Sequence, residues 1–348
     1  MKEFHQIVFW QPAFLGDAVL ALPALAALHQ RFPGAGVHLV VRRGVEGLFA
    51  AQPGLTSVRG FDKRGAERSL GAALRLGREL GRGLPGGPAD LFISAHTSLR
   101  SAAVAWASGI PERIGYDRPW HQRLAYTRTV SRRFDELHEV DRLMELLRPL
   151  GVTGPAPEPR LVPPEAATAR ASALLDPLPR PVLGIHPGST WPTKRWPLEY
   201  FADVAGWAAR AGATVLVFGG PSEAADAAAV VTGAGDPGKG RVLDLAGRLD
   251  LPTLAACLGR LDAYLTNDSG PMHLAWMQGT PTVALFGPTV RSLGFFPRGA
   301  QATVLELDLP CRPCGLHGHK RCPQGHHRCL REVLPEAARA ALAPRLGL

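Results

Sequence analysis

Residues 264–289 read YLTNDSGPMHLAWMQGTPTVALFGPT and contain a complete strand, turn, helix and strand pattern. The apolar run 263–266 predicts a buried parallel strand, and the turn 267–270 offers an N-cap oxygen. Pro271 opens a short helix, because proline is tolerated where its missing N–H would be unpaired anyway. The free N–H groups of that first turn favour an anionic ligand beyond the strand end. A βαβ unit with an ordinary capped helix explains this stretch equally well.

The same alternation recurs on both sides of this unit. We expect strands at 6–10, 37–41, 90–94, 182–186, 214–218, 242–245 and 282–286, and helices at 17–31, 65–80, 99–107, 197–211 and 222–231. Eight prolines lie between 151 and 181, a composition typical of a linker with at most a short helix at 165–175.

The fold class that follows is α/β with two Rossmann-like, doubly wound domains facing across a cleft. We place the N-terminal domain at 1–160, the proline-rich linker at 161–180 and the C-terminal domain at 181–348. A chain of 348 residues is long enough for two such domains. Ligands of such sheets bind beyond the carboxyl ends of the strands, so the loops there are the candidate sites.

The formal net charge of +9 predicts an anionic partner. Nucleic acid, a phosphorylated metabolite and the anionic face of a membrane all satisfy that requirement. We find no secretory signal, and the longest apolar window, 18–28, contains Pro23 and is too short to span a bilayer. We therefore expect a cytoplasmic protein, soluble or peripheral, without a transmembrane segment.

Two glycine motifs have the dinucleotide spacing G-x-G-x-x-G, at 81–86 and 233–238. Each follows a helical pattern and precedes a strand, which is the reverse of the context that would place a pyrophosphate on a helix N-terminus. We interpret both as loops. The sequence also lacks G-x-x-x-x-G-K-[ST], which argues against a P-loop kinase or ATPase.

Asp17 stands at the first strand–helix junction. It has two interpretations, as an N-cap of the following helix or as a carboxylate that acts as general base in the interdomain cleft. The loop of the segment 184–197, GIHPGSTWPTKRWP, carries Ser189, Thr190, Lys194 and Arg195 after a predicted strand. Hydroxyls and two adjacent cations suit phosphate oxygens, although a solvated loop is the simpler alternative.

Glu223 follows the next predicted strand of the same sheet, within FGGPSE. A carboxylate at that edge is suited to accept hydrogen bonds from ribose hydroxyls.

Four motifs together, GDAVLALPAL, HPGSTWPTKRWP, FGGPSE and NDSGPMHLA, resemble those of the ADP-heptose:lipopolysaccharide heptosyltransferases, glycosyltransferase family nine, and more closely the type II branch. The resemblance covers nearly the whole chain in order. It implies a GT-B fold with an N-terminal acceptor domain and a C-terminal nucleotide-sugar domain. It also implies an inverting transfer of heptose from ADP-heptose that requires no metal.

The resemblance assigns roles to several residues of this chain. Asp17 matches the family's proposed base, and Ser189, Thr190 and Lys194 match its phosphate-contacting loop. Glu223 matches the ribose contact, and Asp268, Ser269 and Gly270 match the turn that holds the sugar and pyrophosphate. Lysine and a helix dipole would then stabilise the departing ADP, with Lys194 contributing to catalysis as well as binding.

The expected acceptor is an acidic, phosphorylated glycolipid of the lipopolysaccharide inner core, of the heptosyl-Kdo-lipid A type. It would be met on the inner face of the cytoplasmic membrane, where the positive charge holds the enzyme peripherally. Arg100, Arg113 and Arg118 are candidate acceptor contacts. Two alternatives are a GT-B glycosyltransferase with another nucleotide sugar or acceptor, and a basic nucleic-acid-binding protein with a zinc module at 311–329. Against the second alternative, the basic residues of this sequence are not interleaved with aromatic ones along one element, so no nucleic-acid partner is expected.

Cys311, Cys314, Cys322 and Cys329 form C-x2-C-x7-C-x6-C before the C-terminal helix predicted at 335–343. Disulfides are not expected in the cytoplasm. A structural zinc ion fits the first pair, an iron–sulfur cluster is less favoured, and four reduced thiols in a loop remain an open alternative. The transfer reaction itself requires no cofactor.

Overall fold

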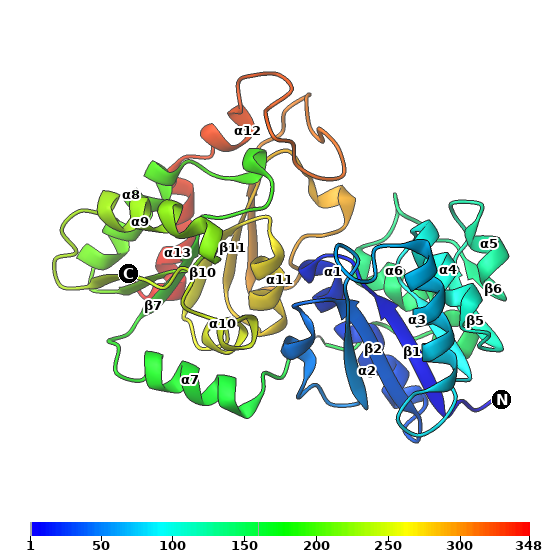
Figure 1. The fold of residues 1–348 in the computed structure, drawn as a ribbon. Coiled ribbons are helices and arrows are strands. Elements are labelled where there is room, and N and C mark those ends of the chain that lie inside the picture. Colours follow the sequence, from blue (N-terminus) through cyan, green and yellow to red (C-terminus); the bar gives the residue numbers. More distant parts are fainter. Residues whose placement is uncertain (1, 159) are drawn as a thin grey trace. The chain divides into compact units, whose positions relative to one another are not determined.

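The computed structural model describes residues 2–158 and 160–348. These form two compact units that divide between Pro164 and Glu165. Each unit is built on one six-stranded parallel sheet (Figure 1). The α/β class predicted from the alternating pattern is therefore confirmed in both halves of the chain.

The sheet of the first unit has the strand order β3-β2-β1-β4-β5-β6. Its strands are β1 Gln6–Gln11, β2 Gly36–Arg42, β3 Ser57–Phe61, β4 Leu91–Ser94, β5 Glu112–Tyr116 and β6 Arg128–Val130. Its helical segments are α1 Leu15–Leu20, α2 Leu22–Arg31, η1 Glu46–Phe49, α3 Leu70–Arg82, α4 Leu99–Ala107, α5 Gln122–Ala125, α6 Glu139–Glu145 and η2 Arg148–Leu150. This order reverses between β1 and β4, where a doubly wound sheet binds its ligands.

The second unit repeats this order as β12-β11-β10-β7-β8-β9, so its reversal lies between β7 and β10. Its strands are β7 Val182–His186, β8 Thr214–Val217, β9 Arg241–Asp244, β10 Ala263–Asn267, β11 Thr282–Phe286 and β12 Ala302–Glu306. Its helical segments are α7 Glu165–Leu175, η3 Pro192–Lys194, α8 Leu198–Arg210, η4 Pro221–Glu223, α9 Ala224–Gly233, α10 Leu251–Leu258, α11 Gly270–Met277, η5 Arg291–Leu293, α12 Arg328–Arg331 and α13 Pro335–Leu346.

Helices cover both faces of each sheet. In the first unit α3, α4 and α5 pack in a row, and α1, α2 and α6 form a second group. In the second unit α8 packs between α9 and α13, while α10 contacts α7 and α11. The central strands are therefore buried on both sides, which explains why the sequence shows continuous apolar runs there instead of alternation.

The single helix predicted at 17–31 is two helices in the structure, α1 and α2, which meet at Ala21. Pro23 explains the break, because a proline inside a continuous helix would clash with the carbonyl four residues earlier and donate no hydrogen bond. In the first turn of α2 it is tolerated. The helix expected at 65–80 begins later, at Leu70, because the Ser69 side chain caps it by accepting from the Ala72 N–H at 3.1 Å.

The predicted linker 161–180 contains the helix α7, which packs against α10 and belongs to the second unit. Its burial on one side, at Ala167, Ala171 and Leu175, explains the attachment. Among the helices of the described residues, none is both long and apolar enough to cross a bilayer.

Candidate functional site

The loops that follow β7 and β10 lie side by side, because these two strands are neighbours at the reversal of strand order in the second sheet. Asn267, the last residue of β10, joins them. Its amide nitrogen donates to the carbonyl of Pro187 at 2.7 Å, and its amide oxygen accepts from the Trp196 N–H at 2.9 Å. One buried side chain therefore fixes both ends of the loop 187–196.

Lys194 and Asp268, predicted from separate motifs, are in direct contact. The Lys194 ammonium lies 2.5 Å from the Asp268 carboxylate, and both side chains are nearly buried. The Thr289 hydroxyl, just beyond β11, donates to the same carboxylate oxygen at 2.6 Å. A lysine held at this edge, beside the N-terminus of α11, is well placed to meet an anionic group.

Glu223 lies at the end of η4, after β8. Its carboxylate accepts from the Gly220 N–H at 2.8 Å and lies 3.2 Å from His186 Nε2. Burial alone would raise the pKa of Glu223, but the contact with His186 and the Gly220 N–H lower it. A Cβ on Gly188 would collide with this carboxylate, so any larger residue there would displace Glu223 from its present position.

The other residues predicted to bind the nucleotide sugar differ in whether their side chains are free to contact a ligand. Ser189 is buried and Thr190 is exposed. Arg195 is engaged within the protein, since its guanidinium donates to the Ser189 carbonyl at 2.9 Å and to Asp226 at 3.0 Å. Ser269 is the N-cap residue of α11 and Gly270 its first helical residue. Arg195 therefore shapes the loop, whereas Thr190, Lys194 and the start of α11 face the edge where a ligand would lie.

The cysteine-bearing segment 311–329 packs directly on this loop. Thr193 is held twice: its hydroxyl exchanges hydrogen bonds with the backbone of His319 at 2.7 and 2.9 Å, and its carbonyl lies 2.8 Å from His327 Nε2. Cys314 donates its N–H to the carbonyl of Pro288, next to Thr289. The segment 311–329 therefore supports both Lys194 and Thr289, the two residues that contact Asp268.

The thiols of this segment influence one another electrostatically. Burial raises the pKa of the Cys329 thiol to about 11, and charges on Cys314, Cys322 and Cys311 contribute to that rise. Within residues 2–158 and 160–348, however, no three His, Cys, Asp or Glu side chains are arranged to hold a metal ion. Zinc binding would therefore require these side chains to converge further.

In the first unit Asp17 lies beyond the end of β1, also at the reversal of strand order. The N-cap interpretation is wrong in detail: Phe14 is the N-cap, and Asp17 sits three residues into α1 with its carboxylate accepting from the Phe14 N–H at 3.1 Å. Burial and the charge of Glu139 raise the pKa of Asp17 to about 6, against the lowering effects of the Phe14 N–H and Arg132. A carboxylate with this pKa is suited to general base catalysis near neutral pH.

Lys63 and Arg132 interact electrostatically with Asp17, and the same two cations also act on His96. Lys63 donates to the Pro12 carbonyl at 2.9 Å, and Arg100 donates to the Lys63 carbonyl at 3.3 Å. Burial, together with Lys63, Arg132 and Arg100, lowers the pKa of His96 to about 4, so His96 is a neutral and weak base. Asp17 is therefore the better candidate for a base in this cluster.

The three arginines predicted to contact the acceptor occupy different places. Arg100 belongs to the cluster around Asp17. Arg113 donates to the carbonyls of Ala125 and Ile110, so its guanidinium holds the fold together. Arg118 is exposed on the loop before α5. Only Arg100 has a contact that ties it to the Asp17 cluster.

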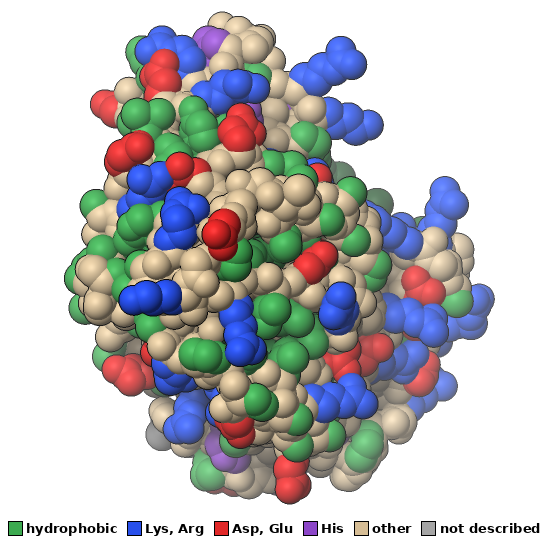
Figure 2. Space-filling model, turned by 90° about the vertical axis from the view of Figure 1, so that its left-hand side faces the viewer, with side chains coloured by type: hydrophobic (Ala, Val, Ile, Leu, Met, Phe, Trp, Pro, Cys, Tyr) green, Lys and Arg blue, Asp and Glu red, His purple; other side chains and the backbone are tan. Residues whose placement is uncertain are grey.

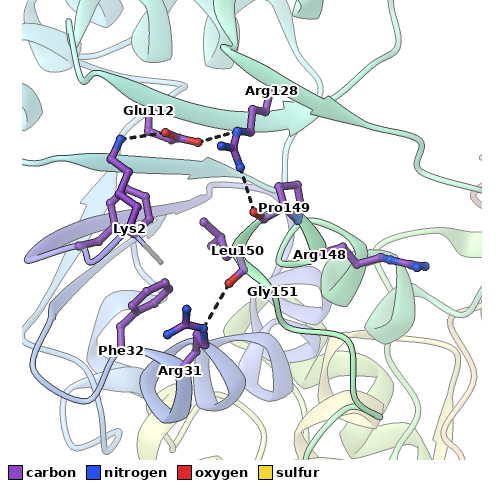
Figure 3. Close-up of a pocket in the computed structure, with 10 residues that line it drawn as sticks. Lys2, Arg31, Phe32, Glu112, Arg128, Arg148, Pro149, Leu150 and Gly151 are labelled. Carbon is purple, nitrogen blue, oxygen red and sulfur yellow. Dashed lines mark hydrogen bonds and ion pairs between the residues drawn. The ribbon is translucent and has the colours of Figure 1, made fainter.

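A pocket of about 350 Å³ opens elsewhere on the first unit (Figure 3). It lies at the amino ends of the strands, opposite to Asp17, and its cations are engaged: Lys2 and Arg128 both contact Glu112, and Arg31 donates to the Leu150 carbonyl. Because doubly wound sheets bind ligands at the carboxyl ends of their strands, we place no substrate here.

The residues 77–324 match the sequence profile of glycosyltransferase family 9 (heptosyltransferase). The chain belongs to glycosyltransferase family 9. The protein is therefore a glycosyltransferase, and the family resemblance carried by the four sequence motifs is confirmed.

Relatives and solved structures agree with this membership. Lipooligosaccharide heptosyltransferase 2 of Campylobacter jejuni is 26% identical over 327 residues, covering 93% of this chain and 94% of the relative. The family 9 glycosyltransferase of Veillonella parvula superposes with a TM-score of 0.87 at 26% identity, covering 99% and 98% of the two chains. Escherichia coli heptosyltransferase WaaC with ADP-2-deoxy-2-fluoro heptose gives 0.71 at 22% identity, covering 97% and 99%. The predicted GT-B fold class is confirmed.

Several residues of the two candidate sites were not predicted from the sequence. Thr289 and His186 contact the predicted donor residues Asp268 and Glu223. Asn267 instead contacts Pro187 and Trp196, at the two ends of the loop that carries Lys194. Lys63 and Arg132 influence Asp17 and His96. Asn267 ends the buried strand β10, and Thr289 lies three residues beyond the end of β11, so the rule that selected the loops at the carboxyl ends of the strands would also have selected them. Lys63 lies in an irregular loop, and no spacing in the sequence relates it to Asp17.

Proposed function

We propose that this glycosyltransferase transfers heptose from ADP-heptose to an acidic glycolipid acceptor of the lipopolysaccharide inner core, with inversion at the anomeric carbon. The observation that carries the proposal is the Lys194–Asp268–Thr289 network at the reversal of strand order in a family 9 chain. Two relatives support the proposal: the Campylobacter jejuni protein and Escherichia coli WaaC are both named heptosyltransferases, and WaaC was solved with ADP-2-deoxy-2-fluoro heptose.

The donor end of the reaction lies in the second unit. Lys194 and the N-terminus of α11 would meet the pyrophosphate, and Ser189, Thr190, Ser269 and Gly270 line the loops around it. When ADP leaves, negative charge develops on its phosphate, and a fixed cation stabilises that charge more than it stabilises the bound donor. Glu223, whose carboxylate is ionised at neutral pH, is suited to accept from the ribose hydroxyls. This chemistry supplies leaving-group stabilisation from the chain itself and calls for no metal.

The acceptor end lies in the first unit. Asp17 would remove the proton of the acceptor hydroxyl as its oxygen attacks the anomeric carbon. Direct displacement of ADP by that oxygen forms one bond as the other breaks, and it inverts the configuration. Lys63, Arg100 and Arg132 give the Asp17 cluster the positive charge that an acidic acceptor requires.

Protection against thermal unfolding by a panel of nucleotide sugars tests the donor assignment. Because a ligand that binds only the folded state stabilises it by mass action, ADP-heptose at about 100 times its Kd should add about 2.7 kcal/mol. UDP- and GDP-sugars at the same concentration should add much less. A larger shift with another nucleotide sugar would favour the alternative that this family 9 enzyme uses a different donor.

A nucleic-acid partner is not part of this proposal. The face shown in Figure 2 carries lysine and arginine side chains together with acidic ones. Non-specific nucleic-acid binding depends on a basic surface that follows the phosphate backbone, whereas the motifs of this family 9 chain point to a nucleotide sugar. We therefore propose no nucleic-acid partner.

We keep the structural zinc ion at Cys311, Cys314, Cys322 and Cys329 as a proposal, separate from the transfer chemistry. If zinc is bound, elemental analysis of the purified protein should find about one zinc per chain, without the brown colour of an iron–sulfur cluster. Cys314→Ser should lower the metal content and the unfolding temperature together. Four thiols that react freely, in a metal-free protein of unchanged stability, would show that the segment needs no metal.

The same variant has a second expected effect. The segment 311–329 holds Thr193, next to Lys194, so Cys314→Ser should also weaken ADP binding by a few fold. Cys257→Ser, at the lone buried cysteine in α10, is the matched control and should leave the metal content unchanged.

We also propose that the enzyme works in the cytoplasm, bound peripherally to the inner face of the cytoplasmic membrane. The net charge of +9 supports this, since anionic lipid attracts basic proteins.

A further inference from the structure

Large exposed hydrophobic side chains concentrate in one part of the first unit. Of the nine in the described part of the chain, five lie between residues 70 and 124. Four of these form what we call the apolar patch: Leu99, Trp106, Trp120 and Leu124, which are 63%, 62%, 74% and 71% exposed. Single exposed hydrophobic residues are common, but a group containing two tryptophans indicates an interaction surface.

The patch is built by two helices that pack together. Leu99 and Trp106 are seven residues apart on α4, with the half-buried Ala103 between them, so they share one helical face. Trp120 lies two residues before α5 and Leu124 lies within it, and α5 packs against α4. The buried Gln122 joins the two elements, because its amide donates to the Thr97 carbonyl at 2.8 Å. The patch therefore belongs to a fixed part of the fold.

Cations border the patch. Arg118 and Arg123 are both exposed, on the same short stretch as Trp120 and Leu124. Asp117 is the nearby acid, and it lies 3.8 Å from Arg123 with only a quarter of its side chain exposed. The stretch 117–124 therefore combines two exposed apolar side chains with two exposed arginines, against a single acid that is only partly exposed.

We propose that the apolar patch, with Arg118 and Arg123, docks this enzyme on the surface of an anionic phospholipid bilayer. Tryptophan is favoured at the boundary between headgroups and acyl chains, where its ring is apolar and its N–H stays solvated. Arginine beside it attracts the anionic headgroups. This docking would do without a membrane-spanning helix.

Docking through the apolar patch would bring the enzyme to its acceptor. This link between docking and catalysis rests on the proposed function. The α4 helix that carries Leu99 and Trp106 begins at the carboxyl edge of the sheet, where Arg100 belongs to the Asp17 cluster. An acceptor anchored in a bilayer by its lipid would then present its sugar close to Asp17. Arg118, predicted to bind the acceptor, would instead contact headgroups.

Co-sedimentation with vesicles that contain no acceptor tests the docking by itself. Wild-type protein should sediment with vesicles of phosphatidylethanolamine and phosphatidylglycerol, and much less with phosphatidylcholine or at high salt. Trp120→Ser/Leu124→Ser should lower the bound fraction at least about tenfold, because both apolar anchors are lost. Arg118→Gln and Arg123→Gln should each weaken binding about fivefold, the loss expected for one cation near an anionic surface.

Leu316→Ser/Leu334→Ser is the matched control, since it removes two exposed leucines from the second unit. It should sediment as the wild type does. The proposal is overturned if wild-type protein does not sediment with anionic vesicles, if the patch variant sediments normally, or if the control loses as much. Wild-type protein that does not bind vesicles but dimerises through the patch would likewise overturn the proposal.

Transfer assays separate this proposal from the proposed function. Trp120→Ser/Leu124→Ser should keep wild-type kcat/KM on an acceptor freed of its acyl chains, and lose about tenfold on the same acceptor embedded in vesicles. Equal loss on both acceptors would overturn the docking role. If the wild type transfers to neither acceptor, the proposed function fails, and the vesicle experiment still decides the docking.

Discussion

Asp17→Asn should lower kcat for heptose transfer by about 100- to 10,000-fold, the contribution usual for a general base, while ADP-heptose binding stays near wild type. The asparagine oxygen can still accept from the Phe14 N–H, so the start of α1 should remain intact. Steady-state kinetics and the unfolding temperature should be measured on the same preparation. Asp250→Asn is the matched control, because Asp250 caps α10 without a proposed role in transfer.

The pH dependence gives a second measure of the same residue. The pKa of Asp17 is raised to about 6, and a base acts only when deprotonated. The rate should therefore fall as the pH is lowered through about 6 and level off above it. If Asp17→Asn keeps more than about a tenth of wild-type kcat, the Asp17 carboxylate only stabilises the first turn of α1, and another group acts as the general base.

Lys194→Ala should weaken ADP binding about tenfold or more, as expected when a charged hydrogen bond is lost. It should also lower kcat by about 100-fold, because the cation contributes most when ADP departs. Lys194→Arg should recover only part of both, since a planar guanidinium does not replace a compact ammonium in a fitted site. ADP binding by calorimetry and single-turnover rates separate the two effects.

Loss of Lys194 also removes the cation that pairs with the buried Asp268 carboxylate, which keeps its hydrogen bond from the Thr289 hydroxyl. Lys194→Ala/Asp268→Asn removes both charges and should restore stability without restoring ADP affinity. Lys239→Ala, on an exposed loop of the same unit, controls for the loss of one positive charge. Normal ADP binding by a folded Lys194→Ala would contradict the phosphate role.

Most of the fold could be predicted from the sequence, because buried parallel strands consist of uninterrupted apolar runs. The strands 182–186 and 282–286 were placed without error, and the reversal of strand order brings their loops to one edge. Errors occurred where a local signal was missed. Pro23 divides one predicted helix, and Ser69 delays the start of another.

Residues of the candidate sites could be predicted from the sequence only where a motif places them together on one loop. Lys194 and Asp268 came from separate motifs, and only the fold shows that they contact each other. The support that the segment 311–329 gives to Thr193 joins positions more than a hundred residues apart. The cluster of Lys63, Arg100 and Arg132 likewise depends on tertiary packing, so no periodicity or spacing could have revealed it.

The transfer reaction itself tests the central claim most directly. Purified enzyme should be incubated with ADP-heptose and a Kdo-lipid A type acceptor, and the products followed by mass spectrometry and by ADP release. We predict an acceptor heavier by one heptose, ADP released in equal amount, and inverted configuration at the new bond. Release of ADP without a glycosylated acceptor, or transfer only from a different nucleotide sugar, would contradict the account.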